Sequence, residues 1–156
     1  MPMRPHFSDT LLAIREQVAT SLPAEARLQR AMELVHEQHS QYEWVGIYVL
    51  RGDVLELGPH VGAPTEHVRI RVGEGVCGTA VAQERNQVVE DVRQLDNYLA
   101  CSPSVRSEIV VLMRDGEEVL GEIDADSDDI AAFGPDDEAF LTQVAALLAP
   151  LVREIR

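Results

Sequence analysis

The segment WVGIYVL, residues 44–50, marks a change of period in the sequence. Before it, apolar residues recur every three or four positions, whereas from residue 43 onward they alternate with a period of two. Its β-branched residues fall on one face of the expected strand: Val45, Ile47 and Val49. Two aromatics flank a glycine on the other face: Trp44, Gly46 and Tyr48. We therefore expect a strand with a core face and an aromatic face that carries a recess.

The same period of two recurs in five later segments, which are separated by turn signals such as Asp115-Gly116. The expected strands are 53–57, 68–72, 87–91, 107–113 and 118–126. Helices are expected from Ser8 to about Ser21, from Pro23 past Val35, over 78–85 and over about 135–154. This order predicts an α+β fold with an antiparallel sheet of about six strands. The N-terminal helices and the C-terminal helix would cover one face, leaving a loop-covered ligand pocket on the other.

Composition limits the possible partners and locations. The chain has 156 residues, which fits a single domain over 1–156, and carries 27 acidic and 13 basic residues for a net charge of −14. Such a surface repels nucleic acid and anionic membranes. No apolar run approaches the length of a membrane span, and the first ten residues lack the apolar region of a signal peptide. We therefore expect a cytoplasmic protein whose two cysteines are reduced or transiently oxidised.

Acidic residues share one face of two expected strands. In EVLGEIDAD, residues 118–126, three acids alternate with apolar residues: Glu122, Asp124 and Asp126. In SEIVVLM, residues 107–113, Glu108 shares a face with apolar residues. Most charge runs are solvated faces, but three like charges in a row on one strand are unfavourable. A carboxylate on an apolar face is uncommon unless it is hydrogen-bonded or functional, and for Glu108 both interpretations stay open.

The hairpin register decides whether these acids meet. A two-residue turn at Asp115-Gly116 sets Glu108 opposite Ile123, whereas a three-residue loop with a bulge sets it opposite Asp124. We expect the second register, because only that one gathers Glu108 with Asp124 and Glu122. Clustered, partly buried carboxylates raise one another's pKa, so that one can stay protonated near neutrality and act as a general acid beside an ammonium site.

The two cysteines lie in GVCGTA, residues 75–80, and in YLACSPS, residues 98–104. Cys77 comes just before the helix expected from Gly78, where the helix dipole favours a thiolate. Cys101 follows a segment that reads as a loop. An isolated free cysteine is more often a small buried apolar residue, so neither position alone indicates chemistry. Two cysteines exclude a zinc site built only from cysteine, and we expect no metal.

Six motifs occur in one order along the chain. They are WVGIY at 44–48, GEGVCGTA at 73–80, DV at 91–92, AC at 100–101, SEIVV at 107–111 and LGEIDADS at 120–127. In order and spacing this set resembles the GAF-domain free methionine-(R)-sulfoxide reductases, from about Ser8 to the end of the chain. The resemblance implies a GAF fold and the thiol-dependent reduction of free L-methionine (R)-sulfoxide to methionine.

The resemblance also implies a role for each matching residue. Cys101 would attack the sulfoxide sulfur and become a sulfenic acid, and Cys77 would lie at the site and help to resolve it as a disulfide. Substrate binding and protonation of the sulfoxide oxygen would involve Glu108, Asp124 and Asp126. The S-methyl end would be enclosed by Trp44 and Tyr48. No bound cofactor is expected, because an external thiol reductant such as a thioredoxin system would restore the enzyme. Analogy with GAF domains suggests a homodimer.

The chain departs from the family pattern at residue 67 and at a few other positions. The family commonly has a third cysteine ten residues before the GVCG cysteine, and His67 stands there in this chain. Three alternatives follow: Cys77 resolves the sulfenic acid, an external thiol does so, or the chain is a non-catalytic GAF domain that binds a small molecule or senses redox state. A reversible Cys77–Cys101 disulfide without any substrate is a further interpretation. Ser102-Pro103 and Leu112 also differ from residues common in the family.

Overall fold

The computed structural model describes residues 5–96, 98 and 103–156. Its helices are α1 (Pro5–Val18), α2 (Ala24–Gln38), α3 (Gly75–Gln83), the 3₁₀ helix η1 (Val92–Gln94) and α4 (Pro135–Ile155). Its strands are β1 (Trp44–Arg51), β2 (Val54–Val61), β3 (Arg69–Arg71), β4 (Gln87–Val89), β5 (Ser107–Asp115) and β6 (Glu118–Ser127). The strands form one antiparallel sheet in the order β3-β2-β1-β6-β5-β4. The predicted α+β architecture is therefore confirmed.

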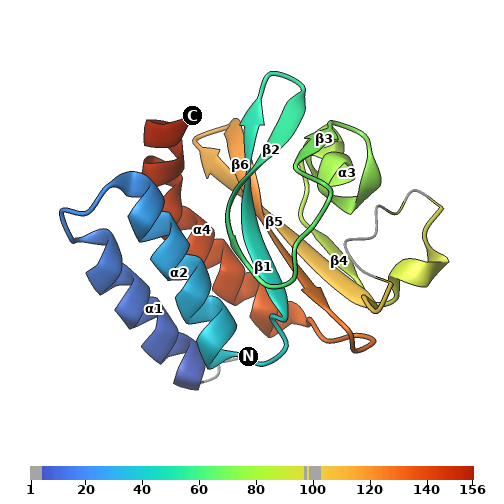
Figure 1. The fold of residues 1–156 in the computed structure, drawn as a ribbon, viewed down its shortest axis with the longest axis horizontal. Coiled ribbons are helices and arrows are strands. Elements are labelled where there is room, and N and C mark those ends of the chain that lie inside the picture. Colours follow the sequence, from blue (N-terminus) through green and yellow to red (C-terminus); the bar gives the residue numbers. More distant parts are fainter. Residues whose placement is uncertain (1–4, 97, 99–102) are drawn as a thin grey trace.

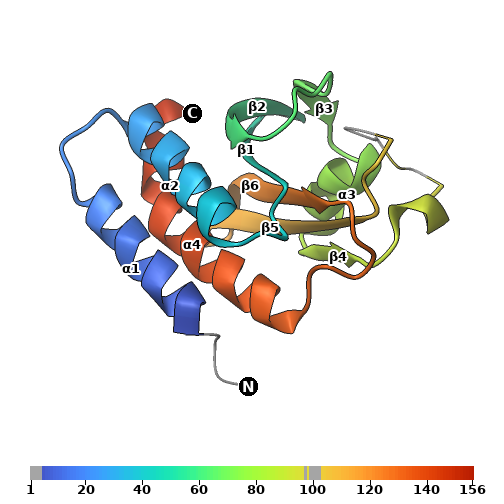
Figure 2. The same cartoon turned by 60° about the horizontal axis from the view of Figure 1, so that its bottom comes forward.

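The helices divide between the two faces of the sheet (Figures 1 and 2). The long helices α1, α2 and α4 lie together on one side, and the short helix α3 lies on the other, over β5 and β6. The two faces accordingly carry two separate apolar clusters. Helix α3, not the long helices, therefore covers the sheet face on which the acidic residues were expected.

Strand β1 shows why the alternation in sequence predicts the faces correctly. Val45, Ile47 and Val49 are buried in the core under the long helices, whereas Trp44 and Tyr48 belong to the cluster under α3. Successive side chains of a strand point to opposite faces, so a period of two separates the two environments. The recess expected at Gly46 does not form, because the indole ring of Trp44 covers that position.

Helix α3 begins three residues earlier than the sequence suggested. The N–H of Gly78 donates to the carbonyl of Glu74 at 2.9 Å and closes the first turn of a helix that starts at Gly75. Gly75 has φ +63, a conformation that glycine adopts without a steric penalty. Cys77 is therefore a residue of the first helical turn.

The β5–β6 hairpin has neither of the two registers considered from the sequence. Asp115 pairs with Glu118 across a turn at 116–117, and a bulge places Leu120 between the pairs Arg114–Val119 and Met113–Gly121. As a result Glu108 lies opposite Asp126, not Asp124 or Ile123. The bulge also moves Val119 to the α3 side and Leu120 to the core of the long helices, the reverse of a simple alternation.

The acids nevertheless share one face. The observed register is displaced by two positions from the expected one, and an even displacement preserves which side chains share a side of the sheet. No helix within the described ranges 5–96 and 103–156 is long and apolar enough to span a membrane.

Candidate active site

Four carboxyl groups lie on the sheet face that α3 covers. One comes from strand β5 and three from its neighbour β6: Glu108, Glu122, Asp124 and Asp126. Each is at most 5% exposed, and Glu122 is completely buried. Acidic side chains are rarely buried unless they are paired or functional, so this face is an unusual electrostatic environment.

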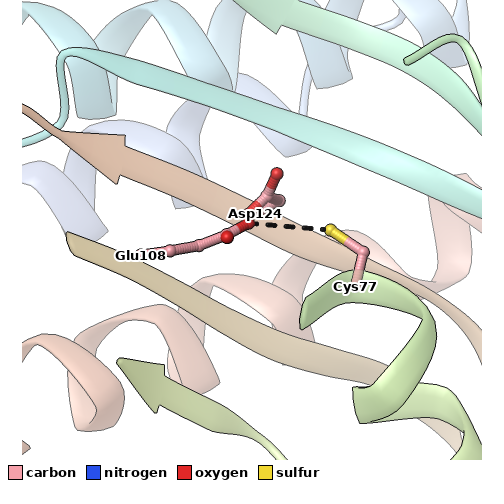
Figure 3. A group of neighbouring side chains, drawn as sticks. All are labelled: Cys77, Glu108 and Asp124. Carbon is pink, nitrogen blue, oxygen red and sulfur yellow. Dashed lines mark hydrogen bonds between the residues drawn. The ribbon is translucent and has the colours of Figure 1, made fainter. Parts of the chain in front are cut away.

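Helix α3 brings the thiol of Cys77 to these acids (Figure 3). The Sγ atom of Cys77 lies 3.9 Å from the Oε2 atom of Glu108 and donates a long hydrogen bond to it. The donor atoms of Cys77, Glu108 and Asp124 all lie within 4.8 Å of one another. Helix α3 and the two strands of the β5–β6 hairpin thus meet at one point.

The glycine after the cysteine allows this approach. A Cβ atom added to Gly78 would overlap the carbonyl oxygen of Arg71 and lie 2.9 Å from the backbone nitrogen of Gly73. Only a residue without a side chain fits between α3 and the loop that leads into it. Gly78 is therefore required for the close packing of α3, and this packing fixes the position of the Cys77 thiol.

Burial determines the protonation of this cluster. Burial raises the pKa of the Cys77 thiol well above its ordinary value of 9.0, and the nearby charges of Asp124, Glu122 and Glu108 raise it further. The helix dipole favours a thiolate at this position, but desolvation and the three acids outweigh the dipole. At neutral pH Cys77 is a neutral thiol.

Two of the acids have raised pKa values as well. Burial raises the pKa of Glu122 well above its ordinary value, and the neighbouring Asp124 adds to the rise. Burial likewise raises the pKa of Asp124, and hydrogen bonding from Glu108 and Cys77 offsets part of that rise. Both oxygens of Glu122 and the Oδ1 atom of Asp124 lack a hydrogen-bond partner of good geometry among the described residues. Burial therefore favours the protonated forms of these two acids.

The two aromatic residues line the same face. The ring centroids of Trp44 and Tyr48 lie 6.4 Å apart, and the Tyr48 hydroxyl donates to the carbonyl oxygen of His67 at 2.8 Å. Trp44 pairs with Asp126 across the β1–β6 ladder, and Tyr48 pairs with Glu122. Each aromatic side chain therefore stands next to a carboxyl group.

Two cavities adjoin the acidic face at different points. A cavity of about 10 Å³ is bordered by Tyr48, His67, Cys77, Glu108 and Asp124, among others. A cavity of about 130 Å³ is bordered by Glu43, Trp44, Val105, Asp126 and others. A third, of about 440 Å³, lies between the β5–β6 turn and α4, where Arg153 pairs with Asp115, and none of its described lining residues is a cysteine. Of these three cavities, the first is bordered by Cys77, Glu108 and Asp124, and the second by Asp126.

The structure brings together six of the seven residues singled out from the sequence, together with Glu122. The seventh, Cys101, lies outside the described residues, as does Ser102. From the sequence, His67 was not expected to belong to a site. In the structure His67 borders the smaller cavity, beside Cys77. The signal that could have identified it is its position, where the related family commonly has a cysteine.

Comparison with known proteins identifies the family. The GAF domain model matches residues 23–151. The free methionine-R-sulfoxide reductase of Escherichia coli is 40% identical over 123 residues, which cover 79% of this chain and 74% of that protein.

Two solved structures are similar to all or most of the chain. The type II free methionine-R-sulfoxide reductase of Thermoplasma acidophilum is 46% identical, with a TM-score of 0.82 over 84% of this chain and 93% of that one. The Neisseria meningitidis reductase, solved in complex with its substrate, is 31% identical, with a TM-score of 0.88 over 100% of this chain and 96% of that one. The chain therefore belongs to the GAF-domain family of free methionine-R-sulfoxide reductases.

Proposed function

We propose that this protein reduces free L-methionine (R)-sulfoxide to methionine, with Cys101 as the nucleophile. The convergence of Cys77 with Glu108 and Asp124 on one buried face carries the proposal, because sulfoxide reduction needs thiols and an acid at the same place. Relatives named for this activity in Escherichia coli and Thermoplasma acidophilum support it.

The protonated state of Cys77 supports different chemical roles for the two cysteines. A thiolate is the attacking form, and the pKa of the Cys77 thiol is raised by burial and by nearby acids. Cys101 is the better candidate for the first attack. Its thiolate would attack the sulfoxide sulfur, which gains two electrons and loses its oxygen, while the Cys101 sulfur loses two electrons and becomes a sulfenic acid. Methionine leaves at this stage.

The buried acids supply the proton that the oxygen needs. Raised pKa values favour the protonated forms of Glu122 and Asp124, and a carboxylic acid of this kind would protonate the sulfoxide oxygen as its bond to sulfur breaks. When ionised, the same face attracts the ammonium group of a free amino acid. Trp44, beside Asp126 in the larger cavity, would pack against the S-methyl end, and Tyr48 would close the opposite side.

Turnover then requires a second thiol and an external reductant. The Cys77 thiol would attack the Cys101 sulfenic acid, forming a disulfide and releasing water. A dithiol reductant of the thioredoxin type would reduce that disulfide by exchange. These steps need a thiol-reducing compartment, so we propose the cytoplasm as the place of action. A single GAF domain that assembles as a homodimer completes the proposal.

The second candidate is a GAF domain that binds an amino-acid-like ligand without catalysis. The observation that favours it is His67, which stands where a third cysteine is common and borders the cavity beside Cys77. A domain of this kind would bind methionine or its sulfoxide and leave the sulfoxide unchanged.

Turnover of racemic free methionine sulfoxide with a dithiol reductant distinguishes the two candidates. We expect the wild-type protein to consume only the R form, Cys101→Ser to be inactive, and Cys77→Ser to accumulate a sulfenic acid that a dimedone probe traps. Binding without consumption of the R form would reject the reductase and favour the binding domain. Activity retained by Cys101→Ser would reject Cys101 as the nucleophile.

A further inference from the structure

The Cys77, Glu108 and Asp124 side chains have the arrangement of metal ligands. Their donor atoms lie within 4.8 Å of one another, and the Cys77 Sγ to Glu108 Oε2 distance is 3.9 Å (Figure 3). Tetrahedral zinc with bonds of about 2.3 Å to sulfur and about 2.1 Å to oxygen places those two ligand atoms about 3.6 Å apart. A contraction of about 0.3 Å would bring this pair to that spacing, and pairs that lie up to 4.8 Å apart would close by more as the ion binds.

An independent observation concerns the buried oxygens of Asp124 and of the neighbouring Glu122. The Oδ1 atom of Asp124, which is 1% exposed, has no hydrogen-bond partner of good geometry within the described chain, and the same holds for both oxygens of Glu122. No arginine in the described ranges forms an ion pair with either residue. Buried carboxylates without partners are costly unless a proton or a cation neutralises them.

The space at this point suits a single ion. The cavity beside Cys77 and Asp124 has a volume of about 10 Å³, roughly the space of one water molecule. It is too small for an amino acid, whereas the cavity at Trp44 and Asp126, about 130 Å³, is more than ten times larger. A single metal ion therefore fits the part of the acidic face that adjoins Cys77.

The donor set selects the class of metal. One sulfur and two carboxylate oxygens suit a borderline ion such as Zn²⁺, and Cd²⁺ is its softer analogue. Mg²⁺ and Ca²⁺ prefer six or more oxygen ligands, which three side chains including a thiol do not provide. Three protein ligands leave a fourth position open, as in zinc sites that also bind water.

We propose that Cys77, Glu108 and Asp124 bind one zinc-class divalent cation, which competes with substrate for the acidic face. Binding of the ion depends only on these three residues. Its consequence, reversible inhibition of turnover, rests on the proposed function, because the bound ion occupies the Cys77 thiol and two of the acids that sulfoxide reduction would use.

Metal titration of the reduced full-length protein tests the site. We expect Cd²⁺ to produce the ultraviolet thiolate-to-metal charge-transfer band with one ion per chain, and Zn²⁺ to displace it. Cys77→Ser should lose the band, and Glu108→Gln and Asp124→Asn should weaken Zn²⁺ binding by about tenfold or more. The matched controls Cys101→Ser and the surface variant Glu118→Gln should keep both the band and the stoichiometry. Mg²⁺ should not compete.

The opposite pattern overturns the proposal. A band that disappears in Cys101→Ser but persists in Cys77→Ser, or Zn²⁺ affinity unchanged in both carboxylate variants, would place the metal elsewhere. Circular dichroism confirms that each variant is folded, and the two carboxylate variants keep the shape of the native side chains. Reductase activity is measured separately. Metal binding without turnover would support the metal site and reject the proposed function. Turnover without metal binding would support the proposed function and reject the metal site.

Discussion

The thiol of Cys77, in helix α3, lies 3.9 Å from the Oε2 atom of Glu108, in strand β5. Both side chains are buried, at 4% and 5% exposure. In such an environment a charge on one group is felt strongly by the other. The reactivity of the cysteine is therefore coupled to the protonation of the acids.

Cys77 should react slowly with alkylating reagents. In a Cys101→Ser variant, Cys77 is the only thiol, and burial together with three acids raises its pKa. We expect iodoacetamide at neutral pH to leave it unlabelled in the folded protein and to label it fully in denaturant, as measured by mass spectrometry. Adding Asp124→Asn should speed labelling, because it removes the largest charge effect on the thiol pKa. Rapid labelling before any acid is replaced would contradict the raised pKa.

The stability of the protein should depend on the ionisation of Glu122. Its folded pKa is raised above the ordinary 4.5 by burial, so the folded state binds the proton more tightly than the unfolded state. The contribution to stability is present in full below pH 4.5 and is lost as the pH rises through the folded pKa. The free energy of unfolding should fall in that window by up to about 1.4 kcal/mol per pH unit for this proton.

Glu122→Gln should reduce that slope by the part due to one proton and leave the part due to Asp124. Denaturant unfolding measured from acidic to mildly alkaline pH checks this. The exposed Glu117→Gln is the matched control and should leave the slope unchanged. Equal slopes in wild type and Glu122→Gln would show that Glu122 does not hold a proton in the folded state.

The fluorescence of Trp44 should report whether the cavity of about 130 Å³ beside Asp126 is occupied. It is the only tryptophan of the chain, it is 5% exposed, and it borders the cavity beside Asp126. Free methionine (R)-sulfoxide should cause a saturable change in tryptophan emission, and the S form should not. Gly46→Ala should weaken this response by about tenfold, because an added Cβ lies 2.7 Å from the indole ring and 2.7 Å from the Cβ of His60. An unaltered titration in Gly46→Ala would place the substrate away from Trp44.

Gly78→Ala should destabilise the fold and displace Cys77. The added Cβ would overlap backbone atoms of Arg71 and Gly73, which cannot rotate away as a side chain can. We expect a loss of about 1–3 kcal/mol in the free energy of unfolding and faster alkylation of Cys77 in the Cys101→Ser background. Gly134→Ala is the control: no heavy atom lies within 4 Å of its added Cβ, and the cost should stay below about 1 kcal/mol. Equal costs for both substitutions would contradict the close approach at α3.

The sequence by itself determined the order of the elements and the faces of the strands outside the β5–β6 bulge. The period of two in β1 separates Val45 and Ile47 from Trp44 and Tyr48, because side-chain direction along a strand is a local property. For the same reason the acids of β6 were assigned to one side correctly, and the order of motifs was enough to recognise the family. The residues that meet at the candidate site were predictable to that extent.

Only the tertiary structure decided the register and the chemistry of the thiol. The bulge at Leu120 sets Glu108 opposite Asp126, and no local pattern specifies where a hairpin absorbs an extra residue. The N-terminal position of Cys77 in a helix suggested a thiolate, but packing of α3 on the sheet buries the sulfur among three acids and raises its pKa. The pKa of the thiol depends on its burial and on nearby charges, and both are contributed by segments that are distant in sequence. These effects therefore arise only when the chain has folded.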